Sequence, residues 1–243
     1  MECLYQPDMI KNFAPLILEQ SEQKNFKVLR LKENDRVMVT NGKGLSAIVS
    51  IHYNKDWNVS LMPLEFFDNL GELTRKISLM ICKISDKDRL EFIIEKSTEI
   101  GIIEILLSQC TYSQPNKINI ERLKSKAVSA IKQSKRSVLP EIKEFLSIEL
   151  LLKEISTNTI VILLDEQGDT PLSQINNVDF KSGLNSFLII VGPEGGLASE
   201  EKRKISSLIK KGNLIKWNLG NRRLRTETAA IKALSILTTI IES

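Results

Sequence analysis

Residues 187–202, FLIIVGPEGGLASEEK, combine an apolar run, a glycine turn and a charged segment. The run FLIIV is typical of a buried strand, and the segment after the glycines has a helical pattern. A strand, a glycine turn and a helix in this order often form a nucleotide-binding loop. The stretch therefore predicts an α/β fold with a ligand near residues 192–196.

The segments around this stretch continue the alternation of strands and helices. Apolar runs at 77–84, 102–107, 159–168 and 214–220 predict further strands. Amphipathic or charged segments at 89–101, 121–139, 200–212 and 225–243 predict helices. Alternation of this kind predicts a mostly parallel sheet, with ligands beyond the carboxyl ends of its strands.

The first seventy residues have a different pattern. Short strand-like runs lie at 37–39, 47–51 and 57–63, with an Asn41-Gly42 turn signal between the first two. Strands at this spacing predict a small β-barrel. The polar segment at 68–76 separates it from the α/β region, so we expect domains at residues 1–70 and 71–243.

Composition excludes several classes of protein. No apolar run is long enough to span a membrane, and the N-terminus has no signal-peptide pattern. The three cysteines, Cys3, Cys82 and Cys110, are too few, odd in number and too scattered for a disulfide framework or a zinc site. With His52 as the one histidine, a histidine-rich metal centre is excluded. We expect a cytoplasmic protein without metal.

Basic residues concentrate in the second part of the chain. Residues 1–70 carry eight basic and nine acidic side chains, whereas residues 111–145 carry eight against three and residues 200–225 nine against two. Such an excess indicates a polyanionic partner. A solvated lysine-rich surface is the alternative, and charge alone does not decide between them.

The glycine loop does not have the residues of a phosphate site. A P-loop needs Lys-Ser/Thr after its glycines, and a dinucleotide fingerprint needs G-x-G-x-x-G. Glu194 instead puts a carboxylate where phosphate would approach the helix, which repels an anion. The loop is better suited to a neutral or cationic ligand, with a plain tight turn as the alternative.

The segment 219–234, LGNRRLRTETAAIKAL, places three arginines before a helix. Thr226 or Thr228 suits the helix cap, and Glu227 suits the positive end of the helix dipole. Cations are unfavourable at this end unless an anion lies opposite. The arginines therefore indicate contacts to phosphate or to an electron-rich base.

These motifs together resemble the RsmE family of bacterial 16S ribosomal RNA (uracil-N3)-methyltransferases, of the SPOUT superfamily. The resemblance covers VGPEGGLASEE (191–201), 219–234, EKSTEIGI (95–102), KQSKRSVLPEI (132–142) and NFKVLRLKENDRVMVTNGKG (25–44). Lys132 and Lys135 depart from the pattern, since they stand where the family often has Glu and Gly. Several ordered motifs along the whole chain make the resemblance specific.

The resemblance implies a SPOUT-type α/β fold with a deep trefoil knot, a PUA-like N-terminal β-barrel that helps to hold RNA, and a homodimer. It implies S-adenosyl-L-methionine as cofactor and 16S rRNA, free or in the small ribosomal subunit, as partner. The residues expected at the cofactor are Leu164, Asp165, Val191, Gly192, Pro193, Glu194, Gly195, Gly196, Leu219, Gly220, Leu224 and Thr226.

Arg225, Glu194 and Glu227 are the candidate catalytic residues. We expect Arg225 to stabilise negative charge on a uracil carbonyl, and Glu194, Glu227 or water to accept the N3 proton. The residues expected to contact RNA are Arg30, Lys124, Lys132, Lys135, Arg136, Arg222 and Arg223. Alternative functions are a non-catalytic RNA-binding protein and a methyltransferase for another rRNA or tRNA nucleotide.

Overall fold

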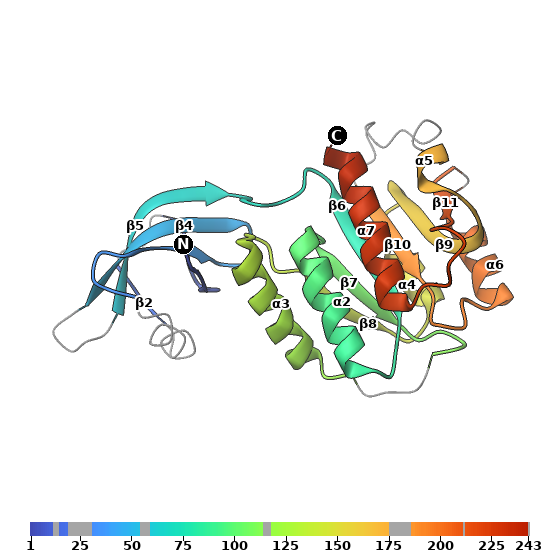
Figure 1. The fold of residues 1–243 in the computed structure, drawn as a ribbon, viewed down its shortest axis with the longest axis horizontal. Coiled ribbons are helices and arrows are strands. Elements are labelled where there is room, and N and C mark those ends of the chain that lie inside the picture. Colours follow the sequence, from blue (N-terminus) through green and yellow to red (C-terminus); the bar gives the residue numbers. More distant parts are fainter. Residues whose placement is uncertain are drawn as a thin grey trace. The chain divides into compact units, whose positions relative to one another are not determined.

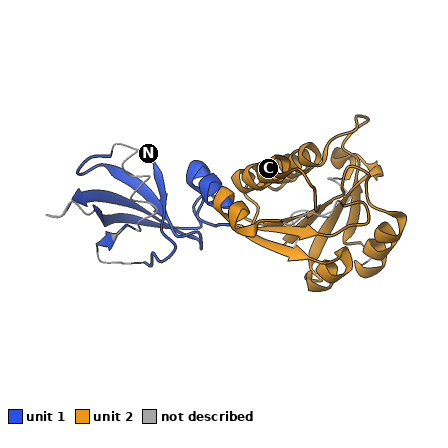
Figure 2. Ribbon diagram, turned by 90° about the horizontal axis from the view of Figure 1, so that it is seen from below, with its two compact units in different colours: residues 1–72, 127–139 blue, residues 73–126, 140–243 orange. Residues whose placement is uncertain are grey.

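The computed structural model describes residues 1–11, 15–18, 31–53, 59–113, 118–174, 186–210 and 212–242. The chain forms two compact units (Figure 2). Unit 1 comprises residues 1–72 and 127–139, and unit 2 comprises residues 73–126 and 140–243. The chain therefore leaves unit 1 near the boundary expected at residue 70, and the segment 127–139 returns to it.

Unit 1 contains a five-stranded sheet in the order β1 (Cys3–Tyr5), β3 (Arg36–Thr40), β4 (Leu45–Tyr53), β5 (Val59–Asp68) and β2 (Leu16–Ile17). β1 pairs with β3 in parallel, and the other pairs are antiparallel. Alternate residues of β3 and β4 point into one core that includes Val37, Val39, Ala47 and Val49. The expected strands at 37–39, 47–51 and 57–63 overlap β3, β4 and β5.

Unit 2 contains a six-stranded sheet in which every pair is parallel. This confirms the predicted α/β class with a parallel sheet. Its order is β11 (Leu214–Trp217), β9 (Thr159–Asp169), β10 (Ser186–Val191), β6 (Lys76–Cys82), β7 (Glu104–Ser108) and β8 (Glu141–Phe145). The inner strands are continuous apolar runs because a parallel sheet is covered on both faces.

Helices cover both faces of this sheet (Figure 1). α2 (Lys87–Ile100) and α7 (Thr226–Glu242) pack side by side on one face. α4 (Ile148–Glu154) and α6 (Ser199–Leu208) lie on the other, where Leu152 and Ile205 share a core with Leu188 and Ile190 of β10. The helix α5 (Pro171–Gln174) is a single short turn.

The sequence pattern did not predict β8 or α4. β8 has the sequence EIKEF, in which Ile142 is the buried residue between charged neighbours. A strand at the edge of a sheet needs few apolar residues, so its pattern resembles that of a loop. α4 has seven residues, too few to show a clear helical period.

α3 (Ile120–Ser134) is shorter than the expected helix at 121–139. It ends because Lys135 adopts a left-handed conformation with φ 58°. The Arg136 amide then donates to the Ile131 carbonyl at 3.0 Å, the bond that closes a Schellman turn. Glycine usually occupies this position, and a lysine there concealed the helix end. Lys135 is therefore not on the helical face that we expected it to share with Lys124 and Lys132.

Strand order brings three loops to one edge of the unit 2 sheet. β10 lies between β9 and β6, and β11 lies beside β9. Because the strands are parallel, the loops that follow β9, β10 and β11 all emerge at the carboxyl edge. Among the described helices, none is long and apolar enough to cross a membrane.

Candidate functional site

The second half of β9, from Leu164 to Gln167, and the loops after β10 and β11 line a cavity of about 710 Å³. Each residue expected at the cofactor lines this cavity, from Leu164 and Asp165 through residues 191–196 to Leu219, Gly220, Leu224 and Thr226. Arg222 and Arg223 line it too. The structure thus brings these residues to one place, while their role in binding a cofactor remains a prediction.

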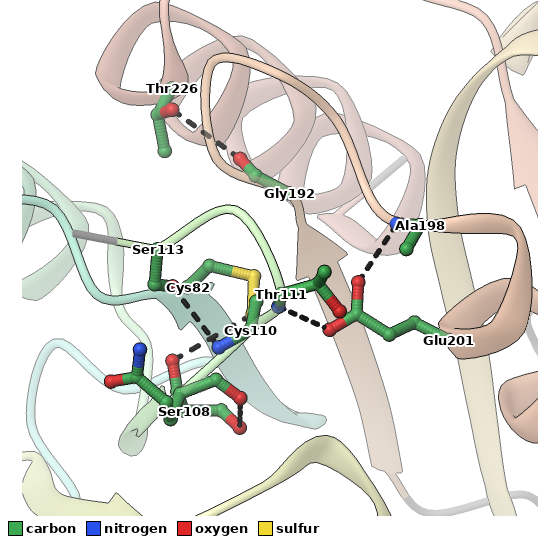
Figure 3. Close-up of a disulfide and its surroundings, with 10 residues drawn as sticks. Cys82, Ser108, Cys110, Thr111, Ser113, Gly192, Ala198, Glu201 and Thr226 are labelled. Atoms are coloured by element: carbon green, nitrogen blue, oxygen red, sulfur yellow. Dashed lines mark hydrogen bonds between the residues drawn. A yellow bond between two sulfur atoms is a disulfide. The ribbon is translucent and has the colours of Figure 1, made fainter. Parts of the chain in front are cut away.

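The glycine loop at 192–196 is held by short-range contacts. The Gly196 amide donates to the Pro193 carbonyl at 2.8 Å, and Gly196 has φ 75°, which favours glycine. The Gly192 carbonyl accepts from the Thr226 hydroxyl at 3.3 Å (Figure 3). A Cβ atom on Gly192 would lie 3.1 Å from the Leu197 amide nitrogen, so a side chain there would require the loop backbone to shift by a few tenths of an ångström.

Glu201 links the start of α6 to a neighbouring loop. Its carboxylate accepts from the Ala198 amide and from the Thr111 amide, both at 2.8 Å (Figure 3). Ala198 is the N-cap residue of this helix, and Glu201 satisfies its amide because alanine has no side-chain acceptor. The Glu201 carboxylate therefore joins α6 to the chain after β7.

A disulfide between Cys82 and Cys110 lies close to this junction (Figure 3). The cysteine pattern predicted no disulfide framework and did not reveal this single disulfide. β6 and β7 are parallel neighbours, so the end of β6 at Cys82 lies beside the residues that follow β7. Their encounter depends on strand pairing, which the spacing of cysteines along the chain does not reveal.

The loop after β11 is fixed by Asn218 and Lys232. The Asn218 amide group donates to the Glu166 carbonyl at 2.7 Å, and its side-chain oxygen accepts from the Gly220 amide at 2.8 Å. The Lys232 ammonium on α7 donates to the Leu219 carbonyl at 2.7 Å. The sequence analysis did not identify either residue as part of the site.

Asp165 places a buried carboxylate at the end of the apolar part of β9. Its side chain is 2% exposed and pairs with Lys202 at 3.1 Å. Burial alone would raise the pKa of Asp165, but the Gln167 amide and the Lys202 ammonium outweigh it and hold the pKa below its usual value. Asp165 therefore stays ionised and can accept hydrogen bonds from a ligand.

Arg89 on α2 bridges the two candidate catalytic carboxylates. Its Nη1 lies 2.5 Å from Glu194 Oε1, and its Nε and Nη2 lie 2.9 and 2.5 Å from Glu227 Oε2. Burial would raise the pKa of Glu227, but the bonds from Arg89 and the charges of Arg89 and Arg225 hold it below its usual value. The same bonds, led by Glu227, raise the pKa of Arg89.

The sequence analysis missed Arg89, although one signal was present. A cation in the first turns of a helix is unfavourable because of the helix dipole. An arginine at such a position therefore indicates an anionic partner, as we argued for the arginines at 222–225. The partners lie 105 and 138 residues away along the chain, so only the fold identifies them.

Arg222, Arg223 and Arg225 are exposed. Arg223 donates to the Glu194 carbonyl at 3.0 Å, so its guanidinium lies over the glycine loop. Arg225 directly precedes α7 and does not line the cavity. Cationic groups thus lie at the cavity and beside it, next to the two carboxylates that Arg89 binds.

The other residues expected to contact RNA lie in different environments. Lys124 is exposed and pairs with Glu121 at 2.9 Å, and Lys135 is exposed beyond the end of α3. Lys132 is half-buried on α3. Arg30 lies outside the described residues.

Arg136 is 2% exposed, and its Nη2 lies 2.5 Å from Glu72. Its guanidinium is directed at a protein carboxylate inside unit 1, so we no longer include Arg136 among the expected RNA contacts. In the described ranges, no group of three or more His, Cys, Asp or Glu side chains could hold a metal ion.

Comparisons with known proteins agree on one family. A family model described as an RNA methyltransferase domain matches residues 72–238. Ribosomal RNA small subunit methyltransferase E of Rickettsia conorii is 29% identical over 208 residues, which cover 86% of this chain and 82% of the relative. The protein of the same name from Bacillus subtilis is 28% identical over 220 residues, covering 86% and 84%.

Solved structures extend this similarity to the whole fold. A putative methyltransferase from Legionella pneumophila, in complex with the cofactor S-adenosylmethionine, has a TM-score of 0.80 and 27% identity, covering 98% of this chain and 96% of that chain. A probable rRNA-methyltransferase from Porphyromonas gingivalis has a TM-score of 0.83 and 25% identity, covering 100% and 99%.

Proposed function

Because the chain belongs to the RsmE family of RNA methyltransferases, we propose that it transfers a methyl group from S-adenosylmethionine to N3 of a uridine in 16S rRNA. The observation that carries the proposal is the cavity at the carboxyl edge of the parallel sheet, where the second half of β9 and the loops after β10 and β11 meet beside Arg222 and Arg223. The substrate is assigned by analogy with the named relatives.

The cavity is compatible with this cofactor. Its volume of about 710 Å³ is within the range of small-molecule sites, roughly 300–1,000 Å³. Backbone at Gly192, Gly195 and Gly196 leaves room for close approach, and ionised Asp165 offers an acceptor for hydroxyl or amine groups. Trp217 also lines the cavity, and its buried indole N–H has no hydrogen-bond partner in the described part of the chain.

When bound, S-adenosylmethionine supplies an electrophilic methyl group on a positively charged sulfur. Arg225 holds negative charge on a uracil carbonyl as the N3 proton leaves, which makes N3 nucleophilic. Arg222 and Arg223 bind backbone phosphate. The target base must be unpaired, because N3 lies on its Watson–Crick edge.

Among the candidate proton acceptors, the geometry favours water over the two carboxylates. Arg89 binds both Glu194 and Glu227, and the pKa of Glu227 is below its usual value. A carboxylate of lowered pKa is a weak base toward N3. Proton loss to water, with the resulting uracil anion held by Arg225, is therefore the proposed route.

The proposal includes the architecture of the family. The position of β10 between β9 and β6 supports a trefoil knot in unit 2, and the five-stranded sheet of unit 1 supports a PUA-like RNA-binding domain.

From Ala229 to Ile241, α7 carries only one charged residue, Lys232, which supports a homodimer. A cytoplasmic location follows from a ribosomal substrate.

The proposal is tested by incubating the protein with labelled S-adenosylmethionine and either naked 16S rRNA or small ribosomal subunits from a strain lacking this activity. We expect label at N3 of one uridine, mapped by mass spectrometry of nuclease fragments. Calorimetry with S-adenosylmethionine separates the enzyme from a pure RNA-binding protein, which gives no heat of association. Label on another nucleotide would overturn the substrate assignment alone.

A further inference from the structure

Arg89 is the one described cation that pairs with both candidate catalytic carboxylates. Its side chain is 18% exposed, that of Glu227 is 14% exposed and that of Glu194 is 59% exposed. The guanidinium offers separate N–H groups to each partner, with Nη1 to Glu194 and with Nε and Nη2 to Glu227. Arg89 itself does not line the cavity.

Both carboxylates also lie close to the arginine cluster. Arg223 donates to the Glu194 carbonyl, which places its guanidinium at the same residue. The charge of Arg225 acts on Glu227. Nevertheless, Arg222, Arg223 and Arg225 form no ion pair with any carboxylate in the part of the chain that the structure describes.

We propose that Arg89 is a positioning residue that binds Glu194 and Glu227 and thereby keeps Arg223 and Arg225 available for the anionic RNA substrate. This role rests on the proposed function, since it assumes that RNA is the ligand of the arginine cluster. In this role Arg89 does not contact RNA and acts only through the two carboxylates.

Electrostatics gives the reason for such a residue. An uncompensated carboxylate beside Arg225 would attract that guanidinium and would also repel the uracil anion. Solvent screens both effects, and both weaken with distance. The partly buried Glu227 carboxylate therefore has a larger effect than the more exposed Glu194 carboxylate. One planar guanidinium can satisfy two carboxylates at once, whereas the single ammonium of lysine does so with poorer geometry.

The test measures RNA affinity and turnover in the complete protein. We expect Arg89→Ala to weaken binding of a fluorescein-labelled oligouridylate, measured without S-adenosylmethionine, by about tenfold, the scale of one charge-assisted contact. We expect KM for small subunits to rise with it. Adding Glu227→Gln to Arg89→Ala removes the freed negative charge, and we expect it to restore most of the lost RNA affinity.

Lys96→Ala is the matched control. Lys96 lies on the same helix and also pairs with two glutamates, Glu95 at 2.8 Å and Glu99 at 2.9 Å, but neither lines the cavity. We expect this variant to bind RNA as the wild type does. If Arg89→Ala does not fold, Arg89→Lys with and without Glu227→Gln provides the same comparison.

A purely structural role for Arg89 predicts a different result. In that case Glu227→Gln would not restore the affinity of the Arg89 variant, and this outcome would overturn the proposed role. Wild-type activity with unchanged RNA affinity in Arg89→Ala would do the same while leaving the proposed function intact. A wild-type protein that neither binds the oligouridylate nor methylates subunits would overturn the proposed function and this role together.

Discussion

Arg225 shows how one side chain depends on its neighbours at the site. It is exposed, directly precedes α7 and lies close enough to Glu227 to affect its ionisation. Glu227 is in turn held by Arg89. The charge that Arg225 presents to a ligand therefore depends on a residue of another helix.

Replacing Arg225 with alanine tests its catalytic role. We expect kcat to fall by about 100-fold or more, because a group that stabilises developing charge acts mainly in the transition state. Affinity for S-adenosylmethionine, measured by calorimetry, should change only a few-fold, since Arg225 does not line the cavity. A large loss of cofactor affinity with unchanged kcat would contradict this role.

The lowered pKa of Glu227 predicts how the stability of the protein depends on pH. The pKa of Glu227 in the folded protein is below its ordinary value of about 4.3. The ion pair with Arg89 therefore stabilises the folded protein at pH values above about 4.3. This stabilisation is lost as the pH falls through the pKa of the folded state. We expect Glu227→Gln to lose less unfolding free energy than the wild type between about pH 5 and pH 3. Urea unfolding at stepped pH measures this.

Glu200→Gln is the control for that measurement, because Glu200 is an exposed residue on α6 whose partner is the exposed Arg203. We expect its profile to follow the wild type. If the unfolding free energies of Glu227→Gln and the wild type changed with pH in the same way, the ion pair between Arg89 and Glu227 would contribute little to stability.

At the scale of elements, the approach of β9 to β11 depends on Gly168. A Cβ atom there would lie 2.7 Å from the backbone carbon and oxygen of Lys216. The register of these two strands also shifts between Lys216 and Trp217. The close approach allows the Asn218 amide to reach the Asp169 carbonyl at 2.8 Å, which fixes the loop after β11.

Gly168→Ala should therefore separate these strands. We expect a loss of unfolding free energy of about 2 kcal/mol, as for other overpacked sites, and weaker binding of S-adenosylmethionine. Thermal unfolding and calorimetry measure the two effects. Gly195→Ala is the stability control, because its Cβ would lie at an ordinary 3.6 Å from Tyr112. Equal melting temperatures for the two variants would contradict the argument.

The disulfide joins the ends of two neighbouring strands, with the cysteines 28 residues apart. A loop of this length predicts that reduction lowers the unfolding free energy by about 3.5 kcal/mol. Alkylation of protein purified without reductant, followed by mass spectrometry, should find Cys82 and Cys110 unmodified until dithiothreitol is added. Immediate labelling of both residues on unfolding would show that they are thiols.

At the scale of the whole molecule, the chain crosses between its two units more than once. The returning segment 127–139 is held in unit 1 by Glu72, which accepts from Arg136, from the Ser137 amide at 2.9 Å and from the Val138 amide at 2.9 Å. Glu72 and Arg136 are 9% and 2% exposed. A buried charge pair thus fixes the path of the chain.

We expect Glu72→Gln to destabilise the protein by about 3 kcal/mol, because it removes the charge of a buried carboxylate that pairs with the Arg136 guanidinium. Urea unfolding followed by circular dichroism measures the change. Lys11, whose pair with Asp68 is exposed, provides the control: Lys11→Ala should shift stability by less than about 1 kcal/mol. Similar losses in the two variants would contradict a structural role for Arg136.

Periodicity and glycine placement were enough to predict most of the alternating elements and the parallel sheet, because these features depend on residues that are neighbours along the chain. The family motifs predicted a set of residues that the structure places around one cavity. The same local patterns are compatible with many strand orders. They could not place β10 between β9 and β6.

The Arg89 bridge, the Cys82–Cys110 pair and the burial of Arg136 against Glu72 emerged only from the tertiary structure. Each joins side chains that are far apart in sequence, and each changes what a residue can do chemically. Burial and charge partners set the ionisation of a carboxylate or the reach of a guanidinium, and both depend on which elements pack together.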